Sequence, residues 1–116
     1  MKMLHVTIQT DKFDEEIRFY QDVVGLSIVG DLRPAGRKLV FLADDADATK
    51  VEIIENPEAS CSGNENLSIG FGTDDVEAYR EELIAKGIEV TPVISPNPQV
   101  KFFFVKDPAG VRVQFI

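Results

Sequence analysis

Two kinds of hydrophobic periodicity alternate along the chain. Residues 12–24 have helical spacing, with Phe13, Ile17 and Tyr20 on one stripe. A second helix is predicted over residues 75–86, where Val76 and Leu83 share one face. The remaining apolar runs are short and strand-like. We expect strands at residues 3–10, 26–32, 37–43, 50–55, 66–72, 88–93, 100–106 and 111–116.

Capping and turn residues separate these segments. Gly25 and Gly87 are expected to end the two helices, because glycine adopts the left-handed conformation that follows a helix. The expected N-terminal caps are Thr10 or Asp11 for the first helix and Asp74 with Glu77 for the second. The predicted turns and loops are residues 34–36, 44–47 and 95–98.

The predicted pattern occurs twice. Residues 4–11 align with 67–74 and residues 38–42 with 101–105, both at an offset of 63, while two further segments align at 62. Ordered matches at a nearly constant offset indicate an internal duplication. We therefore predict one domain over residues 1–116, with module one at about 1–56, a linker at about 57–65 and module two at about 66–116. Its fold class is α+β, with two βαβββ modules whose curved mixed sheets form a cleft.

Composition excludes several classes of partner. The formal net charge is −8, which disfavours binding to nucleic acids and to anionic membranes. No apolar run is long enough for a transmembrane helix, and the N-terminus lacks the shape of a signal peptide, so a cytoplasmic location is expected. Cys61 is the only cysteine and has no neighbouring histidine, so we do not expect a catalytic thiol.

Three local motifs identify the chain as resembling a known superfamily. Phe19-Tyr20 precedes Val24-Gly25-Leu26, a second motif covers residues 69–76, and Asp107-Pro108-Ala109-Gly110 precedes the last strand. Together with the βαβββ duplication, they resemble the vicinal oxygen chelate superfamily of glyoxalases, bleomycin-resistance proteins and extradiol dioxygenases. The resemblance covers essentially the whole chain and implies a homodimer with a small-molecule ligand. The modules that form each cleft are expected to come from one chain or from two.

The resemblance also implies where a metal would bind. Metal-dependent members place ligands on the first and last strand of each module, which gives His5 and Glu52 in module one. The repeat places Ser68 over His5 and Gln114 over Glu52, where similar glyoxalases have His and Glu. We expect all four side chains to face one another, from the same chain or from a partner. His5 and Glu52 are suitable ligands for Zn, Ni, Mn or Fe, but only two such groups predict weak binding of a divalent metal.

These replacements affect the expected activity. His5 is the only histidine, so one chain cannot form the two-histidine, one-carboxylate iron site of extradiol dioxygenases. Gln114 cannot accept and return a proton, which leaves Glu52 as the candidate catalytic base for glyoxalase-type isomerisation. Asn56 matches a residue that glyoxalases use with glutathione, whereas Gln9 stands where they have arginine. Asn56 is also a typical turn residue before proline.

Three hypotheses follow. The first is a small-molecule-binding protein without a full metal site, with His5, Thr7, Asn56, Ser68 and Gln114 as ligand-binding residues. The second is a metal-dependent lyase or isomerase of glyoxalase type acting on a 2-oxoaldehyde–thiol adduct. The third is a partner-binding subunit with a vestigial cleft. An alternative structural role for His5 is a hydrogen-bonded core residue paired with Glu52.

Overall fold

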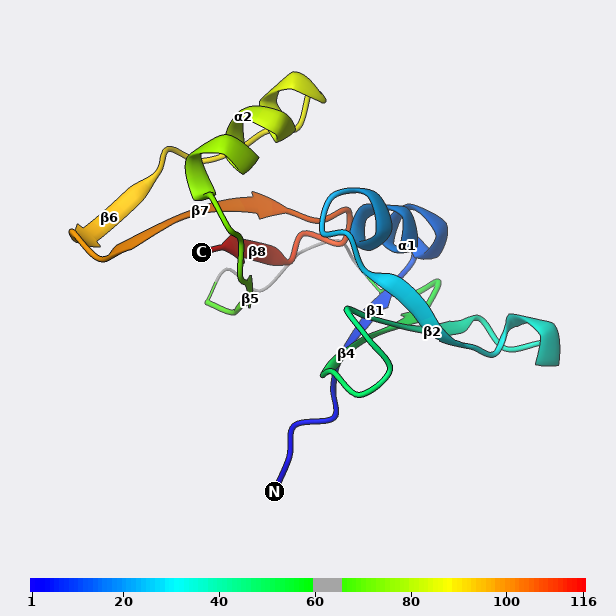
Figure 1. Cartoon of the computed structure of the whole chain (residues 1–116). Coiled ribbons are helices and arrows are strands. Elements are labelled where there is room, and N and C mark those ends of the chain that lie inside the picture. Colours follow the sequence, from blue (N-terminus) through cyan, green and yellow to red (C-terminus); the bar gives the residue numbers. More distant parts are fainter. Residues whose placement is uncertain (60–65) are drawn as a thin grey trace. The chain divides into compact units, whose positions relative to one another are not determined.

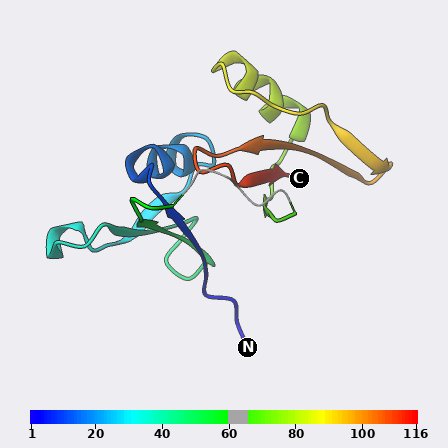
Figure 2. The same cartoon turned by 180° about the vertical axis from the view of Figure 1, so that it is seen from behind.

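The computed structural model describes residues 1–59 and 66–116, drawn in Figures 1 and 2. The chain divides into two compact units, Met1–Ser62 and Gly63–Ile116. Each unit is a βαβββ module, so the fold is α+β with two mixed four-stranded sheets, as predicted. Cys61 lies outside the described residues.

The first unit pairs its first strand with its last. Its elements are β1 (His5–Thr10), α1 (Phe13–Asp22), β2 (Ser27–Asp31), the 3-10 helix η1 (Arg33–Ala35), β3 (Leu39–Ala43) and β4 (Lys50–Glu55). The sheet order is β1-β4-β3-β2, in which β1 and β4 are parallel and the other pairs antiparallel. This parallel pairing places the first and last strands of the module side by side.

The second unit repeats this arrangement. Its elements are β5 (Ser68–Phe71), α2 (Val76–Ala85), β6 (Ile94–Asn97), β7 (Val100–Lys106) and β8 (Arg112–Phe115). The sheet order is β5-β8-β7-β6, again with one parallel pair, β5 with β8. The same topology in both units agrees with the duplication inferred from the sequence.

Each sheet has an apolar core on the face that its own helix covers. In the first unit, Ile8, Ile53 and Val40 lie in one row across three strands and are at most 6% exposed. In Figure 1, α1 lies along this sheet, and it contacts β3 and β4. Its buried side chains are Phe13, Glu16, Ile17 and Tyr20. Burying the apolar side chains of the strands under α1 fixes which strand residues are left on the opposite face.

In the second unit, a corresponding aromatic row forms the core. Phe71, Phe115 and Phe103 are register partners, and Phe103 and Phe115 are at most 2% exposed. Helix α2 contacts β7, and its Leu83 is fully buried. Tyr79 of α2 lies with its ring centroid 5.0 Å from that of Phe115. We call the sheet face opposite each unit's own helix the distal face.

The structure corrects the predicted second strand of module two. Residues 88–93 form no strand, while β6 covers residues 94–97, most of which were predicted to be a loop. β6 is the outermost strand of its sheet, where Pro96 does not interrupt a ladder on both sides. Asn97 pairs with Val100 and closes a tight turn, accepting a hydrogen bond of 2.9 Å from the Gln99 amide. This turn fixes the strand later in the chain than the apolar pattern indicates.

Both predicted N-terminal caps are displaced by one position or more. Helix α1 begins after Lys12, which has no side-chain cap, and the Thr10 hydroxyl instead accepts a hydrogen bond from the Lys12 amide. For α2 the cap is Asp75 rather than Asp74, and its carboxylate accepts from the Ala78 amide at 3.0 Å. Gly25 and Gly87 have the expected positive φ after the helices. Among the described residues, no helix is long and apolar enough to cross a membrane.

Candidate functional site

Polar residues predicted for the site gather on the distal face of the first sheet. Strand alternation places His5 and Thr7 of β1 on that face, because the neighbouring Ile8 points into the core. Thr7 is the register partner of Glu52 on β4, which in turn is the partner of Phe41 on β3. The parallel β1–β4 pairing therefore brings together side chains that are 45 residues apart in sequence.

Glu52 is the centre of this group. Its Oε1 accepts a hydrogen bond of 2.6 Å from the Thr7 hydroxyl, and His5 Nε2 lies 3.7 Å from the same oxygen. The Glu52 side chain is 12% exposed, whereas that of His5 is 41% exposed. The expected pairing of His5 with Glu52 is therefore present, but His5 is not a core residue because its ring is half-exposed, and the 3.7 Å distance is too long for a hydrogen bond.

Phe41 supports the histidine ring. The two ring centroids are 5.8 Å apart with a T-shaped geometry. On the next strand, a Cβ added to Gly30 would lie only 3.1 Å from Phe41 Cδ2. A glycine at this position thus leaves room for the phenyl ring. The sequence pattern did not single out Phe41 or Gly30, although strand alternation alone places Phe41 near Glu52.

Asn56 stabilises a turn and also contacts Gln9 on β1. Its Oδ1 accepts a hydrogen bond from the Glu58 amide at 3.0 Å, which stabilises the turn after β4. Its Nδ2 donates to Gln9 Oε1 at 2.9 Å. Gln9 lies two residues beyond Thr7 on β1, so this amide pair extends the polar stripe.

The second sheet has an equivalent but neutral set of residues. Gly70, Gln114 and Phe104 are register partners, as Thr7, Glu52 and Phe41 are in the first sheet. Ser68 begins β5, as His5 begins β1. A Cβ at Gly70 would lie 3.2 Å from Gln114 Oε1, so the amide lies close to the β5 backbone. The placement of the two sheets' polar residues relative to each other stays a prediction.

Aromatic and basic residues border Gln114 on the same face. Phe103 points into the core, so Phe102 and Phe104 lie on the distal face, with ring centroids 5.6 Å apart. The Arg112 guanidinium lies 4.1 Å from the centroid of Phe104. Arg112 was missed, although it precedes Gln114 by two residues and so shares its face.

The donor set does not fit a complete metal site. Among residues 1–59 and 66–116, no group of three or more His, Cys, Asp or Glu side chains is placed to hold a metal ion. The group around Glu52 supplies one imidazole and one carboxylate, and Thr7 already bonds to that carboxylate. Protein zinc sites use three or four strong ligands. We therefore assign no chemical step to a metal.

Comparison with known proteins defines the class to which this fold and these residues belong. The family model of the Glyoxalase/Bleomycin resistance protein/Dioxygenase superfamily matches residues 2–115, so the chain belongs to that superfamily. A lactoylglutathione lyase from Haemophilus influenzae is 31% identical over 100% of this chain and 92% of its own length. A lactoylglutathione lyase from Neisseria meningitidis is 28% identical over 100% of this chain and 90% of its own.

Solved structures agree with the fold. The fosfomycin resistance protein FosX from Listeria monocytogenes has a TM-score of 0.79 at 17% identity, covering 99% of this chain and 91% of its own. The trypanothione-dependent glyoxalase I of Leishmania major has a TM-score of 0.77 at 24% identity, covering 100% of this chain and 86% of its own. At such identities the likeness shows the fold, and the differing names illustrate how many activities this fold supports.

Proposed function

We propose that this protein binds a small molecule through the distal faces of its sheets, without a complete metal site. The observation that carries the proposal is the arrangement around Glu52. Thr7 occupies one carboxylate oxygen through a 2.6 Å hydrogen bond, and the half-exposed His5 ring lies beside it. These groups present donors and acceptors to a ligand from a rigid pair of strands.

Neutral residues support the metal-free part of this proposal. Ser68 and Gln114 stand where His5 and Glu52 stand in the first sheet, and both form hydrogen bonds readily but are weak metal ligands. Phe104 beside Gln114 offers an aromatic surface to the ligand. Together these side chains favour recognition by hydrogen bonds and apolar contact. We propose a homodimer as the functional assembly, with Asn56 at the end of the ligand-binding stripe.

S-lactoylglutathione is the first ligand to test, because the relatives are named lactoylglutathione lyases. We would titrate S-lactoylglutathione into protein freed of metal with a chelator and measure binding by calorimetry. The proposal expects binding in the presence of chelator and at least a tenfold loss in His5→Ala or Glu52→Ala, since charged hydrogen bonds contribute roughly 1.5–3 kcal/mol. Gln99→Ala, an exposed change in the β6–β7 turn, is the control and is expected to bind normally. Binding that disappears with chelator would contradict the metal-free proposal.

A lyase of glyoxalase type is the second candidate, because curated relatives of this name align along the whole chain. Glu52 is then the residue that accepts the substrate proton, since Gln114 cannot exchange one near neutral pH. Turnover of the adduct between a 2-oxoaldehyde and glutathione is measured with and without Zn, Ni, Mn or Fe. Metal-dependent turnover that is lost in Glu52→Gln would favour this candidate. No turnover with any of the four metals would eliminate it.

A further inference from the structure

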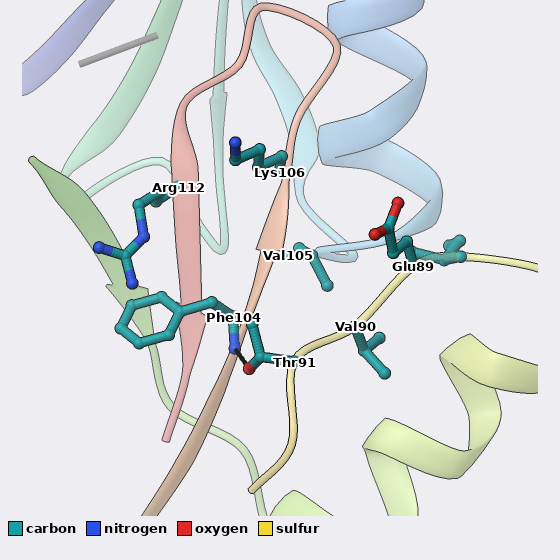
Figure 3. A pocket seen from close by; sticks show the side chains of 8 residues that line it. Glu89, Val90, Thr91, Phe104, Val105, Lys106 and Arg112 are labelled. Atoms are coloured by element: carbon teal, nitrogen blue, oxygen red, sulfur yellow. Dashed lines mark hydrogen bonds between the residues drawn. The ribbon is translucent and has the colours of Figure 1, made fainter. Parts of the chain in front are cut away.

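A pocket of about 330 Å³ lies in the second unit, between residues 88–91 and β7 (Figure 3). Its walls include Val90 and Thr91 on one side and Phe104, Val105 and Lys106 on the other. None of the residues predicted for the site lines it. Phe104, which the proposed function also uses, and Arg112 do line it, so the pocket adjoins the distal face of the second sheet at Gln114.

The pocket exists because the repeat is imperfect at this point. In the first unit, Ser27 and Ile28 of β2 pair with Ala43 and Leu42 of β3. At an offset of 62 to 63, the equivalent residues are Glu89 and Val90, facing Lys106 and Val105, and no strand pairing joins them. The sheet thus has an opening where its counterpart has a continuous ladder.

Two hydrogen bonds between Thr91 and Phe104 close one end of the opening. The Thr91 amide donates to the Phe104 carbonyl at 3.0 Å, and the Phe104 amide donates to the Thr91 hydroxyl at 2.9 Å (Figure 3). A side-chain oxygen thus replaces the backbone acceptor that a regular ladder would supply. The walls of the pocket are therefore fixed at Thr91 and separate toward Glu89.

Two basic side chains border the opening. Lys106 and Arg112 are register partners across β7 and β8, so they lie side by side. Arg112 also lies over the Phe104 ring at 4.1 Å. In Figure 3 Glu89 comes from the opposite wall, on the far side of β7 from Arg112. The whole chain has a formal net charge of −8, whereas this adjacent pair of cations gives the border of the pocket a local positive charge.

We propose that this pocket binds a small monocarboxylate with an apolar body. The carboxylate is recognised by Arg112 and Lys106, because guanidinium and ammonium groups form strong charge-assisted hydrogen bonds with carboxylates. The body contacts Val90, Val105 and the edge of Phe104. Glu89 selects against a second negative charge, because like charges repel at short distance.

Phenylacetate is the probe, with neutral phenylacetamide and dianionic phenyl phosphate as matched compounds. Each is titrated into the full chain, and amide chemical shifts are followed by NMR. Phenylacetate is expected to bind at least about tenfold more tightly than either matched compound, with the largest shifts at residues 88–91 and 104–106. Equal affinities for phenylacetate and phenylacetamide, or shifts elsewhere in the chain, would overturn the proposal.

Substitutions distinguish a specific site from general charge attraction. Arg112→Gln and Lys106→Gln are each expected to weaken phenylacetate binding by about tenfold. Lys86→Gln, which removes the same charge from the exposed end of α2, is expected to leave it unchanged. Glu89→Gln is expected to tighten binding, a gain that misfolding does not produce. Equal losses in Lys86→Gln and Arg112→Gln, or no gain in Glu89→Gln, would contradict the proposal.

The same titration separates this pocket from the proposed function. His5→Ala is expected to bind phenylacetate normally, because His5 belongs to the first unit and does not line the pocket. Loss of phenylacetate binding in His5→Ala would show that the probe occupies the distal face of the first sheet instead, and would overturn the pocket assignment. Failure of phenylacetate to bind leaves the results with S-lactoylglutathione unaffected.

Discussion

Thr7 and Glu52 are partners across the parallel β1–β4 pair and share a hydrogen bond of 2.6 Å from the threonine hydroxyl to the carboxylate. The bond fixes the orientation of a carboxylate whose side chain is 12% exposed. One oxygen is thereby directed at Thr7, which leaves the other for a ligand. The pair therefore determines what the distal face presents.

Replacing Thr7 by valine keeps the shape of the side chain but removes the donor. We expect the free energy of unfolding to fall by no more than about 1 kcal/mol, because the bond is partly exposed and a net hydrogen bond contributes 0.5–1.5 kcal/mol. Binding of S-lactoylglutathione is expected to weaken about tenfold, because Glu52 loses its fixed orientation. Urea denaturation and calorimetry measure the two effects. Thr7→Ser retains the hydroxyl and should bind as the unmodified protein does; equal weakening in both variants would contradict this role.

Gly30→Ala tests the support of the histidine ring. The added methyl group would lie 3.1 Å from Phe41 Cδ2, so the phenyl ring must move, and it contacts His5. We expect the His5 ring protons to change chemical shift and the free energy of unfolding to fall by about 1 kcal/mol. Gly72→Ala is the control, because a Cβ there has no neighbour within 4 Å. Unchanged His5 resonances in Gly30→Ala would show that the rings are not coupled.

The double variant Ser68→His with Gln114→Glu tests the predicted convergence of the two distal faces. It gives the second sheet the same two donors that His5 and Glu52 provide in the first. If the faces share one cleft, four strong ligands are available, and tight binding of one zinc ion is expected. Calorimetry measures the gain, and adding His5→Ala should abolish it. Binding that persists without His5 would mean that the second sheet acts alone.

The partly buried Tyr79 phenol is expected to make the protein less stable at alkaline pH. Burial raises the pKa of the Tyr79 phenol above its usual value near 10, and the nearby Glu82 carboxylate adds to this. The unfolded chain therefore loses this proton first, so the stabilisation is present below about pH 10 and declines as the pH rises toward the folded pKa. In Tyr79→Phe the decline of the urea midpoint between pH 9 and 11 should be smaller. An identical decline in both proteins would contradict the assignment.

The fold was predictable because it depends on repeated local patterns. The short apolar runs at residues 3–10 and 50–55 predicted β1 and β4, and the matching offset predicted the second module. The second strand of that module was misplaced because Pro98 and Gln99 form a tight turn between Asn97 and Val100, which apolar periodicity does not detect. Residues 88–93 therefore leave the sheet except at Thr91. That deviation creates the pocket, so the pocket was not foreseeable either.

The candidate site was predictable by position but not by contact. The family resemblance identified His5 and Glu52, and the repeat aligned Ser68 and Gln114 with them. The 2.6 Å bond from Thr7, by contrast, depends on the register of β1 with β4. Phe41 and Gly30 depend on the pairing of β2 with β3, including the irregularity between Ile28 and Gly30. Such cross-strand neighbours require a known sheet order, which a single sequence does not define.

Titration of metal-stripped protein with Ni²⁺, Zn²⁺, Mn²⁺ and Fe²⁺, with His5→Ala measured beside it, shows whether this protein binds its ligand without a complete metal site. No metal is expected to bind tightly, and the two proteins are expected to give similar heats, because no group of three or more His, Cys, Asp or Glu side chains is placed to hold a metal within residues 1–59 and 66–116. Tight one-to-one binding that disappears in His5→Ala would contradict this expectation and would make a metal-dependent lyase the leading function.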